Sequence, residues 1–536
     1  MAPINIKTQL THVSSGRNQT SKTILIILLS LLLRTLIAPY PYSGKGNHHG
    51  LQSAYGGDYE AQRHWMELTI HLPLSEWYTY SEDYWRLDYP PLIAYWSYIM
   101  GLASSKLVGD DSVALFSSRG YESEVHQSFM RATVILSDIL VYFPLTFMLC
   151  KRLAGNYHRG LILWFGVLIQ PSLVSIDNGH FQYNSVCLGL SLGAFHFMTL
   201  SDVVGYKDVF GGILFCMALN WKQMALYYAP VVFSFLLGKC FREKTPIQVM
   251  CKIAILGATV LGTFFILWFP FYHYRAIPEQ NVIDVYSPII RRIFPFSRGL
   301  FEGKVSNIWC ILALKPISIR DRILPGSQPL YALVLTLSMS VPFCVQLFRV
   351  GRNKHSLLTD DTTIKCLLLG AAGTSLSFFL ASFQVHEKSI LLPLAPLSTL
   401  TLDFVTFIPW FSVLSLWSMW HLLCLDKLQI VYVVLLWVYG CYLVYFDIMK
   451  KPTSAIDLKQ CLLEKGCQQV FRIIRPFTIF VMCALHVLEA LIDPPSSLPD
   501  IYPVFWIITG CSSFCFVWFN LLGLLSSRSS ECIKID

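Results

Sequence analysis

Three carboxylates, at Asp58, Glu60 and Asp88, lie in a hydrophilic stretch of an otherwise apolar chain. Asp58 and Glu60 follow the glycines Gly56 and Gly57, which permit close backbone approach. Aromatic residues crowd the same stretch, at Trp65, Trp77, Tyr78, Tyr80, Tyr84 and Trp85. Carboxylates can take a proton from an attacking hydroxyl and bind sugar hydroxyls, while aromatic faces pack on sugar rings. Sugar chemistry is therefore favoured for Asp58. For Glu60 and Asp88, a hydrated loop edge is an equal alternative.

A metal site is another interpretation of the first two carboxylates. Asp58-x-Glu60 could hold a hard divalent cation, because carboxylate oxygens are the ligands that such ions prefer. A zinc site at His386 is poorly supported, since no second His or Cys lies at ligand spacing. The metal interpretation is the weaker of the two.

Other polar residues follow apolar runs further along the chain. His180 and Gln182 stand in the sequence HFQYN, Lys222 stands in WKQM, and His386 and Lys388 stand in QVHEK. A lone His or Lys at a helix end more often snorkels or satisfies a neighbour than binds a ligand. A phosphate leaving group, however, needs donors such as His386 and Lys388.

The long hydrophilic segment 272–329 has more basic than acidic residues. Arg292 and Arg298 stand among aromatic residues in RIFPFSR, a pattern that suits a lipid phosphate beside its apolar tail. The alternative is an incidental excess, because long loops escape the positive-inside rule.

The whole chain has the composition of a polytopic membrane protein. Its 536 residues are 54% hydrophobic and only 14% charged, with a mean hydropathy of +0.52, whereas a soluble domain is about 25% charged. Apolar runs long enough to cross a bilayer recur throughout and predict an all-α protein with about fourteen spans. The net charge of +8 is expected from cytosolic loops that face anionic lipids, so we expect no nucleic-acid partner.

Basic residues predict the orientation in the membrane. If the N-terminus is cytosolic, the short basic loops on the cytosolic side are 151–152, 239–252, 349–365 and 450–475. The same alternation places the Asp58 stretch, the Lys222 turn and the segment 272–329 on the opposite side. Nearly every polar motif therefore shares one face of the membrane.

Arg34, Asp138 and Asp403 are charged residues inside predicted spans. A charge within the membrane is a functional hypothesis by default. Because none of the three lies within the polar motifs, we expect them to pair between helices instead.

Seven motifs resemble one enzyme family. They are PYSGKG (41–46), GDYEAQRHWME (57–67), LDYPPL (87–92), HFQYNSV (180–186), KQMALYYAP (222–230), RIFPFSRGLFEGKVSNIWC (292–310) and FQVHEK (383–388). Over about residues 40 to 400 the chain resembles the endoplasmic-reticulum dolichyl-phosphate-glucose-dependent α-1,3-glucosyltransferases. The likeness is greatest to members that add the first glucose to Man9GlcNAc2-diphosphodolichol, because the members that add the second differ at 303–309. Residues beyond about Asp403 carry no recognised motif.

The resemblance implies a GT-C membrane fold with lumenal interfacial helices and a lumenal active site in the endoplasmic-reticulum membrane, with both termini cytosolic. It implies inverting transfer of glucose from dolichyl-phosphate glucose to the 3-hydroxyl of a terminal mannose on the lipid-linked oligosaccharide. Asp58 matches the family's catalytic base and His386 its donor-handling histidine. A polyprenol phosphate is a good leaving group, so we expect no metal or cofactor. Residues expected to bind substrate are Glu60, Asp88, His180, Gln182, Lys222, Arg292, Arg298, His386 and Lys388.

The expected organisation follows from the spans and the resemblance together. It comprises a cytosolic tail (1–22), a catalytic membrane module (23–405) with lumenal loops 40–128 and 273–328, additional transmembrane helices (406–526) and a second cytosolic tail (527–536).

Other functions fit the same pattern. Addition of the second glucose, or transfer of mannose from dolichyl-phosphate mannose, would use the same scaffold. A lipid-linked-sugar transporter or flippase would be expected to show internal repeats and polar groups near the membrane midplane, which are not evident. A scaffold subunit would not need acidic, aromatic and basic clusters on one face.

Overall fold

The chain forms a bundle of helices in a computed structural model that describes residues 6–46, 56–80, 84–294, 300, 304–315, 317–353, 360–449 and 465–533. Within these ranges every regular element is helical. The α-helices are α1 (Ile6–Ile37), α2 (Asp58–His71), α3 (Pro91–Leu107), α4 (Glu124–Ser137), α5 (Phe143–Ala154), α6 (Tyr157–Leu168), α7 (Pro171–Val174), α8 (Asn184–Met198), α9 (Tyr206–Trp221), α10 (Ala229–Cys240), α11 (Pro246–His273), α12 (Val282–Ile293), α13 (Ile308–Leu312), α14 (Gln328–Arg352), α15 (Asp360–Ala381), α16 (Leu391–Ser398), α17 (Phe407–Trp417), α18 (Trp420–Leu425), α19 (Gln429–Met449), α21 (Lys465–Leu491) and α22 (Ile501–Ile533). Short 3-10 or π-helical segments are Leu74–Glu76, Asp110–Ser112, Asp138–Tyr142, Ser175–Phe181, Gln223–Tyr228, Ile319–Asp321, Pro325–Ser327 and Glu387–Ile390.

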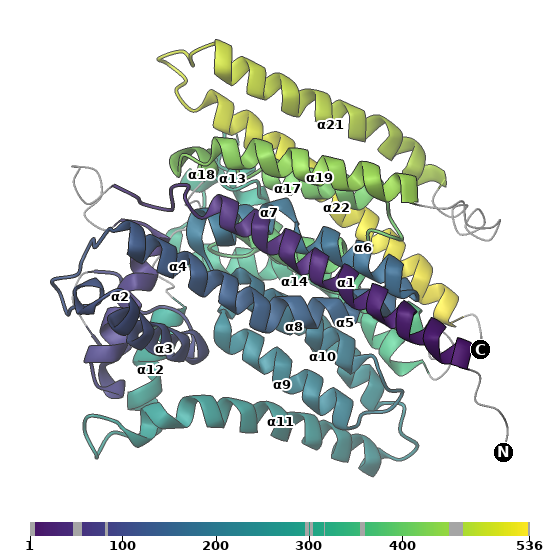
Figure 1. Cartoon of the computed structure of the whole chain (residues 1–536), viewed down its shortest axis with the longest axis horizontal. Coiled ribbons are helices and arrows are strands. Elements are labelled where there is room, and N and C mark those ends of the chain that lie inside the picture. The colour runs from purple at the N-terminus through teal and green to yellow at the C-terminus, as the bar shows by residue number, and fades with distance from the viewer. Residues whose placement is uncertain are drawn as a thin grey trace.

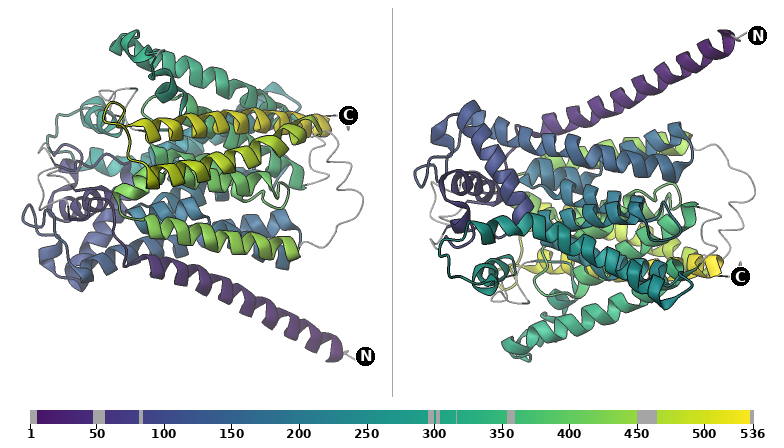
Figure 2. Two further views of the ribbon diagram at one scale, coloured as in Figure 1. Left: turned by 90° about the horizontal axis from the view of Figure 1, so that it is seen from above. Right: turned by 90° about the horizontal axis from the view of Figure 1, so that it is seen from below.

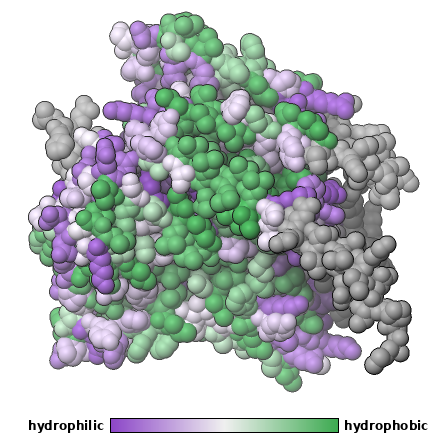
Figure 3. Space-filling model, in the orientation of Figure 1, coloured by the Kyte–Doolittle hydropathy of each residue, from purple (hydrophilic) through white to green (hydrophobic). Residues whose placement is uncertain are grey.

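The long helices run side by side, and the two ends of the bundle differ. The short helices α2, α3 and α12 gather at one end, while the start of α1 and the end of α22 lie at the other (Figure 1). The views in Figure 2 show the same separation. In the face shown in Figure 3, hydrophobic residues cover the middle of the molecule and hydrophilic residues gather toward the ends. This distribution suits a bundle whose middle lies in lipid.

The described residues contain eight helices that are long and apolar enough to cross a membrane. The count rises to nine if the bent pair Tyr157–Leu168 and Pro171–Phe181 forms one span. The chain is therefore a multi-pass membrane protein. Helices such as α8 and α17 are apolar but shorter than this length criterion, and the expected total of about fourteen stays a prediction.

The stretch expected to be a lumenal loop is largely helical. Helices α2 and α3 occupy much of it, and the two prolines of LDYPPL start α3, with Pro91 in its first turn. The expectation that Asp58 and Glu60 lie in a loop is wrong, because both belong to the first turn of α2. Two helical positions differ by about 200° around the axis, so the carboxylates point to different sides.

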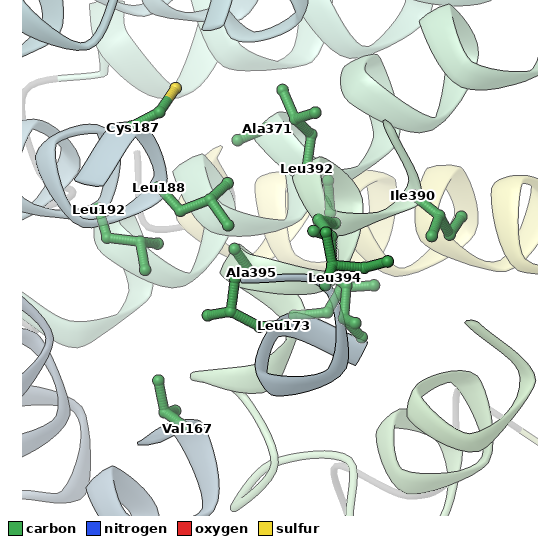
Figure 4. Close-up of a cluster of buried hydrophobic side chains, with 14 of the residues drawn as sticks. Val167, Leu173, Cys187, Leu188, Leu192, Ala371, Ile390, Leu392, Leu394 and Ala395 are labelled. Carbon is green, nitrogen blue, oxygen red and sulfur yellow. The ribbon is translucent and has the colours of Figure 1, made fainter. Parts of the chain in front are cut away.

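Figure 4 shows a cluster of buried hydrophobic side chains from several helices. It includes Val167 of α6, Leu173 of α7, Leu188 and Leu192 of α8, Ala371 of α15, and Leu392 and Leu394 of α16. The helices α8 and α16 begin directly after the motifs HFQY and HEKSI. Packing of these helices therefore fixes the segments that carry His180 and Lys388.

The three charged residues expected inside spans form ion pairs. Arg34 of α1 donates to Asp138 at 2.7 Å, and both side chains are only 1% exposed. The expectation that Asp403 lies inside a span is wrong, because Asp403 lies in the turn between α16 and α17. There it accepts from Lys365 of α15 at 2.8 Å and lies 3.4 Å from Arg528 of α22. The expected pairing between segments is therefore confirmed, although only Arg34 and Asp138 pair within spans.

Candidate active site

The backbone around Asp58 is held by close contact with the PYSGKG segment. The backbone N–H of Asp58 donates to Oγ of Ser43 at 3.3 Å, and the N–H of Ser43 donates to the carbonyl oxygen of His180 at 3.0 Å. A Cβ atom on Gly44, where φ is +78°, would lie 2.1 Å from the backbone nitrogen of Gly57. Only glycine fits this approach. Three segments distant in the sequence thus meet at the start of α2.

One oxygen of the Asp58 carboxylate receives three side-chain donors. Nε2 of His180 lies 2.8 Å from Oδ2, Nε2 of Gln182 donates to it at 2.5 Å, and Nζ of Lys388 also donates to it. Oδ1 accepts no hydrogen bond from any residue that the structure describes. The Asp58 side chain is 25% exposed. One oxygen is therefore fixed while the other is available to a substrate.

The electrostatic surroundings keep Asp58 ionised. Burial acts to raise the pKa of its carboxyl, but Lys388 and His180 outweigh burial and hold the pKa well below its usual value. Its place in the first turn of α2 also favours a negative charge. Asp58 is thus a carboxylate at neutral pH, ready to accept a proton.

His180 lies between two carboxylates. Its Nε2 faces Asp58, and its Nδ1 contacts Oδ2 of Asp426. Asp426 follows the last residue of α18, in the region for which the sequence analysis found no motif. Asp138 and Asp403 stand out in the sequence because they fall inside predicted spans, whereas Asp426 stands between two apolar runs, and that position is the only signal available for it.

Lys222 is buried within a polar chain below Asp58. Its Nζ donates to Oε1 of Gln182 at 2.6 Å and to Oδ1 of Asn184 at 2.8 Å, and it lies 4.9 Å from the ring centroid of Tyr89. Asn184 in turn donates to Asp177 at 2.7 Å. Because Lys222 is only 2% exposed, it does not snorkel to water. It orients Gln182, which binds the carboxylate.

Strained backbone lies beside these polar groups. Phe181, between His180 and Gln182, has a φ of +87°, which is unusual for a bulky residue. Gln384 has a φ of +59°, and Lys427, next to Asp426, has the same value. Such conformations cluster at functional sites, where the surrounding structure holds them.

Glu60 lies outside this cluster. Arg63 donates to both of its oxygens, at 2.7 and 2.6 Å, and Tyr84 donates to it at 2.8 Å. Because Glu60 is bonded to Arg63 on another side of α2, it does not converge on Asp58. The two carboxylates therefore do not form the chelating pair that the spacing allowed.

The remaining expected residues form a second, adjoining group. Arg292 of α12 donates to the carbonyl oxygen of Tyr80 at 2.8 Å. Burial lowers the pKa of Arg292 and Arg86 lowers it further, whereas the nearby Asp88 raises it. The structure thus brings Asp88 near Arg292. His386 is exposed just before the helical turn that carries Lys388, and Arg298 lies outside the described residues.

The arrangement can perform a proton transfer beside an anionic group. An ionised carboxylate with one available oxygen can act as a general base, and the adjacent cation Lys388 can stabilise negative charge on a leaving group. No cluster of three or more His, Cys, Asp or Glu residues suited to a metal ion occurs in the described ranges.

Sequence comparison identifies the group of proteins to which this site belongs. A model of the ALG6, ALG8 glycosyltransferase family matches residues 27–521. The chain belongs to that family. The matched range includes Asp426 and most of the C-terminal helices. Asp426, which contacts His180, lies beyond the predicted end of the catalytic module at 405, and the division of the chain at that residue stays a prediction.

Individual relatives agree with the family match. The dolichyl pyrophosphate Man9GlcNAc2 alpha-1,3-glucosyltransferase of Mus musculus is 36% identical over 531 residues, covering 94% of this chain and 97% of the relative. The protein of the same name from Gallus gallus is 35% identical over 524 residues, with the same coverage. The one from Saccharomyces cerevisiae is 39% identical over 388 residues, covering 71% of this chain and 66% of the relative.

Proposed function

We propose that this chain transfers glucose from dolichyl-phosphate glucose to the 3-hydroxyl of a terminal mannose on Man9GlcNAc2-diphosphodolichol. The observation that carries the proposal is the Asp58 carboxylate, which has one oxygen fixed by three donors and the other available beside Lys388. The family match and the names of the relatives support the same reaction class and acceptor.

The reaction is a single displacement. Oxygen 3 of the mannose attacks C1 of glucose while the bond from C1 to the phosphate oxygen breaks, and its electron pair stays on dolichyl phosphate. Oδ1 of Asp58 takes the hydroxyl proton. Attack from the face opposite the phosphate converts a β linkage into an α linkage. The positive charge that develops on the sugar favours a nearby carboxylate and an anionic leaving group.

Lys388 has two anionic partners during this cycle. In the structure without ligand it donates to Asp58, and the donor phosphate is a second acceptor for the same ammonium group. Movement of Lys388 toward the phosphate stabilises the leaving group and returns basicity to Asp58. His386, exposed two residues earlier, is the second donor for the phosphate.

The finer architecture is part of the proposal. A GT-C fold with about fourteen spans and a lumenal site in the endoplasmic-reticulum membrane suits a bundle whose site lies at the end opposite the termini (Figure 1). The short loops between α10 and α11 and after α14 are rich in basic residues. The positive-inside rule assigns such loops to the cytosolic side, which leaves the opposite side for the site.

The test uses purified protein with either dolichyl-phosphate glucose or dolichyl-phosphate mannose, and with Man9GlcNAc2 or Glc1Man9GlcNAc2 acceptors, each with and without chelator. We expect an α-1,3-linked glucose on Man9GlcNAc2, from the glucose donor, in chelator as well. Transfer only to the glucosylated acceptor would assign the second glucose instead. Transfer only from the mannose donor, or lipid movement without a new glycosidic bond, would overturn the proposal.

A further inference from the structure

We propose that Asp426 is a positioning residue that orients the general base through His180. This inference rests on the proposed function. Asp426 contacts Nδ1 of His180, and Nε2 of the same ring lies 2.8 Å from Oδ2 of Asp58. The three side chains form a line that begins at the end of α18, crosses the π-helical segment Ser175–Phe181 and ends at the first turn of α2.

The line fixes the protonation of the histidine. A ring with a carboxylate at each nitrogen can donate to both only if it carries both protons. A neutral ring would leave a lone pair facing one carboxylate, and at Nε2 that lone pair has Nζ of Lys388, 3.2 Å away, as a donor that Asp58 also binds. His180 is only 3% exposed, so water cannot readily relieve such a contact. Asp426 therefore supplies the negative charge that keeps His180 donating to Asp58.

The backbone holds the line at its middle, next to His180, and at the end formed by Asp426. Phe181, with φ at +87°, follows His180, and Lys427, with φ at +59°, follows Asp426. Arg131 of α4 donates to the carbonyl oxygen of Gly179 at 2.7 Å, which ties the π-helical segment to the bundle. The position of the ring is therefore set by structure on both sides rather than by the substrate.

Other charged groups face the same line. Nζ of Lys388 lies 3.2 Å from Nε2 of His180, and Arg131 interacts electrostatically with Asp426. Lys222 and the Tyr89 hydroxyl interact electrostatically with Asp58. The two carboxylates at the ends of the line offset the charges of His180 and Lys388. Removal of the Asp426 charge upsets this balance while Lys388 stays in place.

The predicted defect is specific to the chemical step. Asp426 does not approach Oδ1 of Asp58, so its loss should leave acceptor binding largely intact and change how Asp58 is held and charged. Without a cationic His180 beside it, Asp58 becomes easier to protonate. The base must be ionised to act. On acidification, the variant should therefore lose activity at a higher pH than the wild type does.

The test compares Asp426→Asn, Asp426→Glu, His180→Gln and the double variant with wild type, with Asp403→Asn as the matched control. Asp403 is also a paired carboxylate of the C-terminal half, but it contacts Lys365 and Arg528. For Asp426→Asn we expect kcat to fall, by less than the roughly 10⁴-fold loss that follows when the orienting carboxylate of a general-base histidine is replaced, because His180 is not itself the base, with little change in KM. The acid limb of the kcat profile should move to higher pH.

Two further results are expected. Asp426→Glu should recover part of kcat because it restores the charge, and the double variant should be no worse than His180→Gln alone because both act through one ring. Wild-type kcat in Asp426→Asn would overturn the inference. The inference would also be overturned if the loss of activity equals the loss of folded protein and the acid limb of the kcat profile does not move.

Failure of this inference is distinct from failure of the proposed function. Wild-type protein that transfers no glucose would overturn the proposed function. Active wild type with an unchanged Asp426→Asn profile would overturn only the role of Asp426. If Asp426→Asn does not fold, His180→Gln and Asp426→Glu carry the test, and an acid limb that does not move in His180→Gln contradicts the inference.

Discussion

Helix α2 carries two carboxylates, and their partners come from different distances along the chain. The partners of Asp58 at Oδ2 lie 122 to 330 residues away in sequence, on His180, Gln182 and Lys388. Glu60 instead bonds to Arg63, only three residues away on the same helix. The Asp58 side chain is 25% exposed, whereas that of Glu60 is 3% exposed. The Asp58 site is assembled from segments distant in the sequence and left open, whereas Glu60 is closed off by Arg63 of the same helix together with Tyr84 and Gly120.

The closed site has a complete set of partners. Arg63 donates to Glu60, to Glu67 at 2.9 Å and to Oγ of Ser118 at 2.5 Å. Glu67 also accepts the backbone N–H of Phe116 at 2.7 Å. A buried cation with this many acceptors is structural, because each of its nitrogens already donates to a protein oxygen. Glu60 and Asp58 are both acidic and both lie in the motif GDYEAQRHWME, so charge and position in the sequence alone do not distinguish a structural carboxylate from a catalytic one.

Replacement of Asp58 by Asn should have the largest effect on activity. We expect glucose transfer to fall about 10²- to 10⁴-fold, because the amide cannot take the hydroxyl proton. The thermal midpoint of the purified protein should also fall, because Lys388 and His180 lose their carboxylate partner, so transfer is expressed per folded molecule. Measurement of labelled transfer and thermal unfolding on the same preparation separates the two effects. Near wild-type turnover would remove the base assignment.

Replacement of Glu60 by Gln should produce the opposite pattern. Breaking one partner of a buried ion pair costs about 3 kcal/mol, so we expect a lower thermal midpoint and a lower yield. Transfer per folded molecule should stay within about threefold of wild type because Glu60 does not face Asp58. A normal midpoint with a large loss of kcat would show that Glu60 belongs to the active site and that the contrast within α2 is wrong.

Replacement of Lys388 by Met should lower kcat about 10- to 100-fold, because a preorganised cation for the leaving phosphate is lost. The pH dependence should change as well. Lys388 holds the pKa of Asp58 well below its usual value, so its removal raises that pKa. Activity needs the ionised base and should therefore disappear at a higher pH on acidification. The measurement is kcat across the acid pH range, with Lys388→Arg as the control that keeps the charge. If Lys388 does not act on Asp58, the acid limb of the kcat profile will not move in Lys388→Met.

The smallest effect is expected at Asp403, whose ion pairs are partly exposed and distant from Asp58. Asp403→Asn removes a partly exposed carboxylate that contacts Lys365 and Arg528, and it should cost about 1 kcal/mol of stability with unchanged kcat. Thermal unfolding and transfer assays check both values. A clear loss of kcat in Asp403→Asn would mean that activity is sensitive to any broken ion pair. The difference between the Asp58 and Glu60 variants could then not be assigned to the active site.

Sequence reasoning located much of the site because its residues stand in short motifs at the ends of apolar runs. His180, Gln182, Lys222 and Lys388 join Asp58 directly or through one another. The sequence predicts a loop around Asp58, in which Glu60, two residues away, can converge with it. In a helix the same spacing separates them.

Asp426 could not be located in the same way. It stands alone in the sequence LDKL, between two apolar runs, and no spacing relates it to HFQYN. Its contact with His180 joins positions 246 residues apart in the sequence. Only the packing of α7, α17 and α19 brings the two together. The helical class was predictable from composition, whereas such pairing depends on the three-dimensional arrangement of the bundle.

The pair formed by Arg34 and Asp138 constrains how the chain enters the bilayer. Asp138 lies near the middle of the span Glu124–Ala154, where an ionised side chain on a solitary apolar helix costs about 3 kcal/mol on insertion scales. Arg34 lies in the last turn of α1, where a long basic side chain can reach the membrane interface. The two charges are synthesised 104 residues apart, so the first helix is made well before the second and offers Arg34 as a partner when Asp138 arrives. Entry of the second helix into lipid is therefore favoured beside the first.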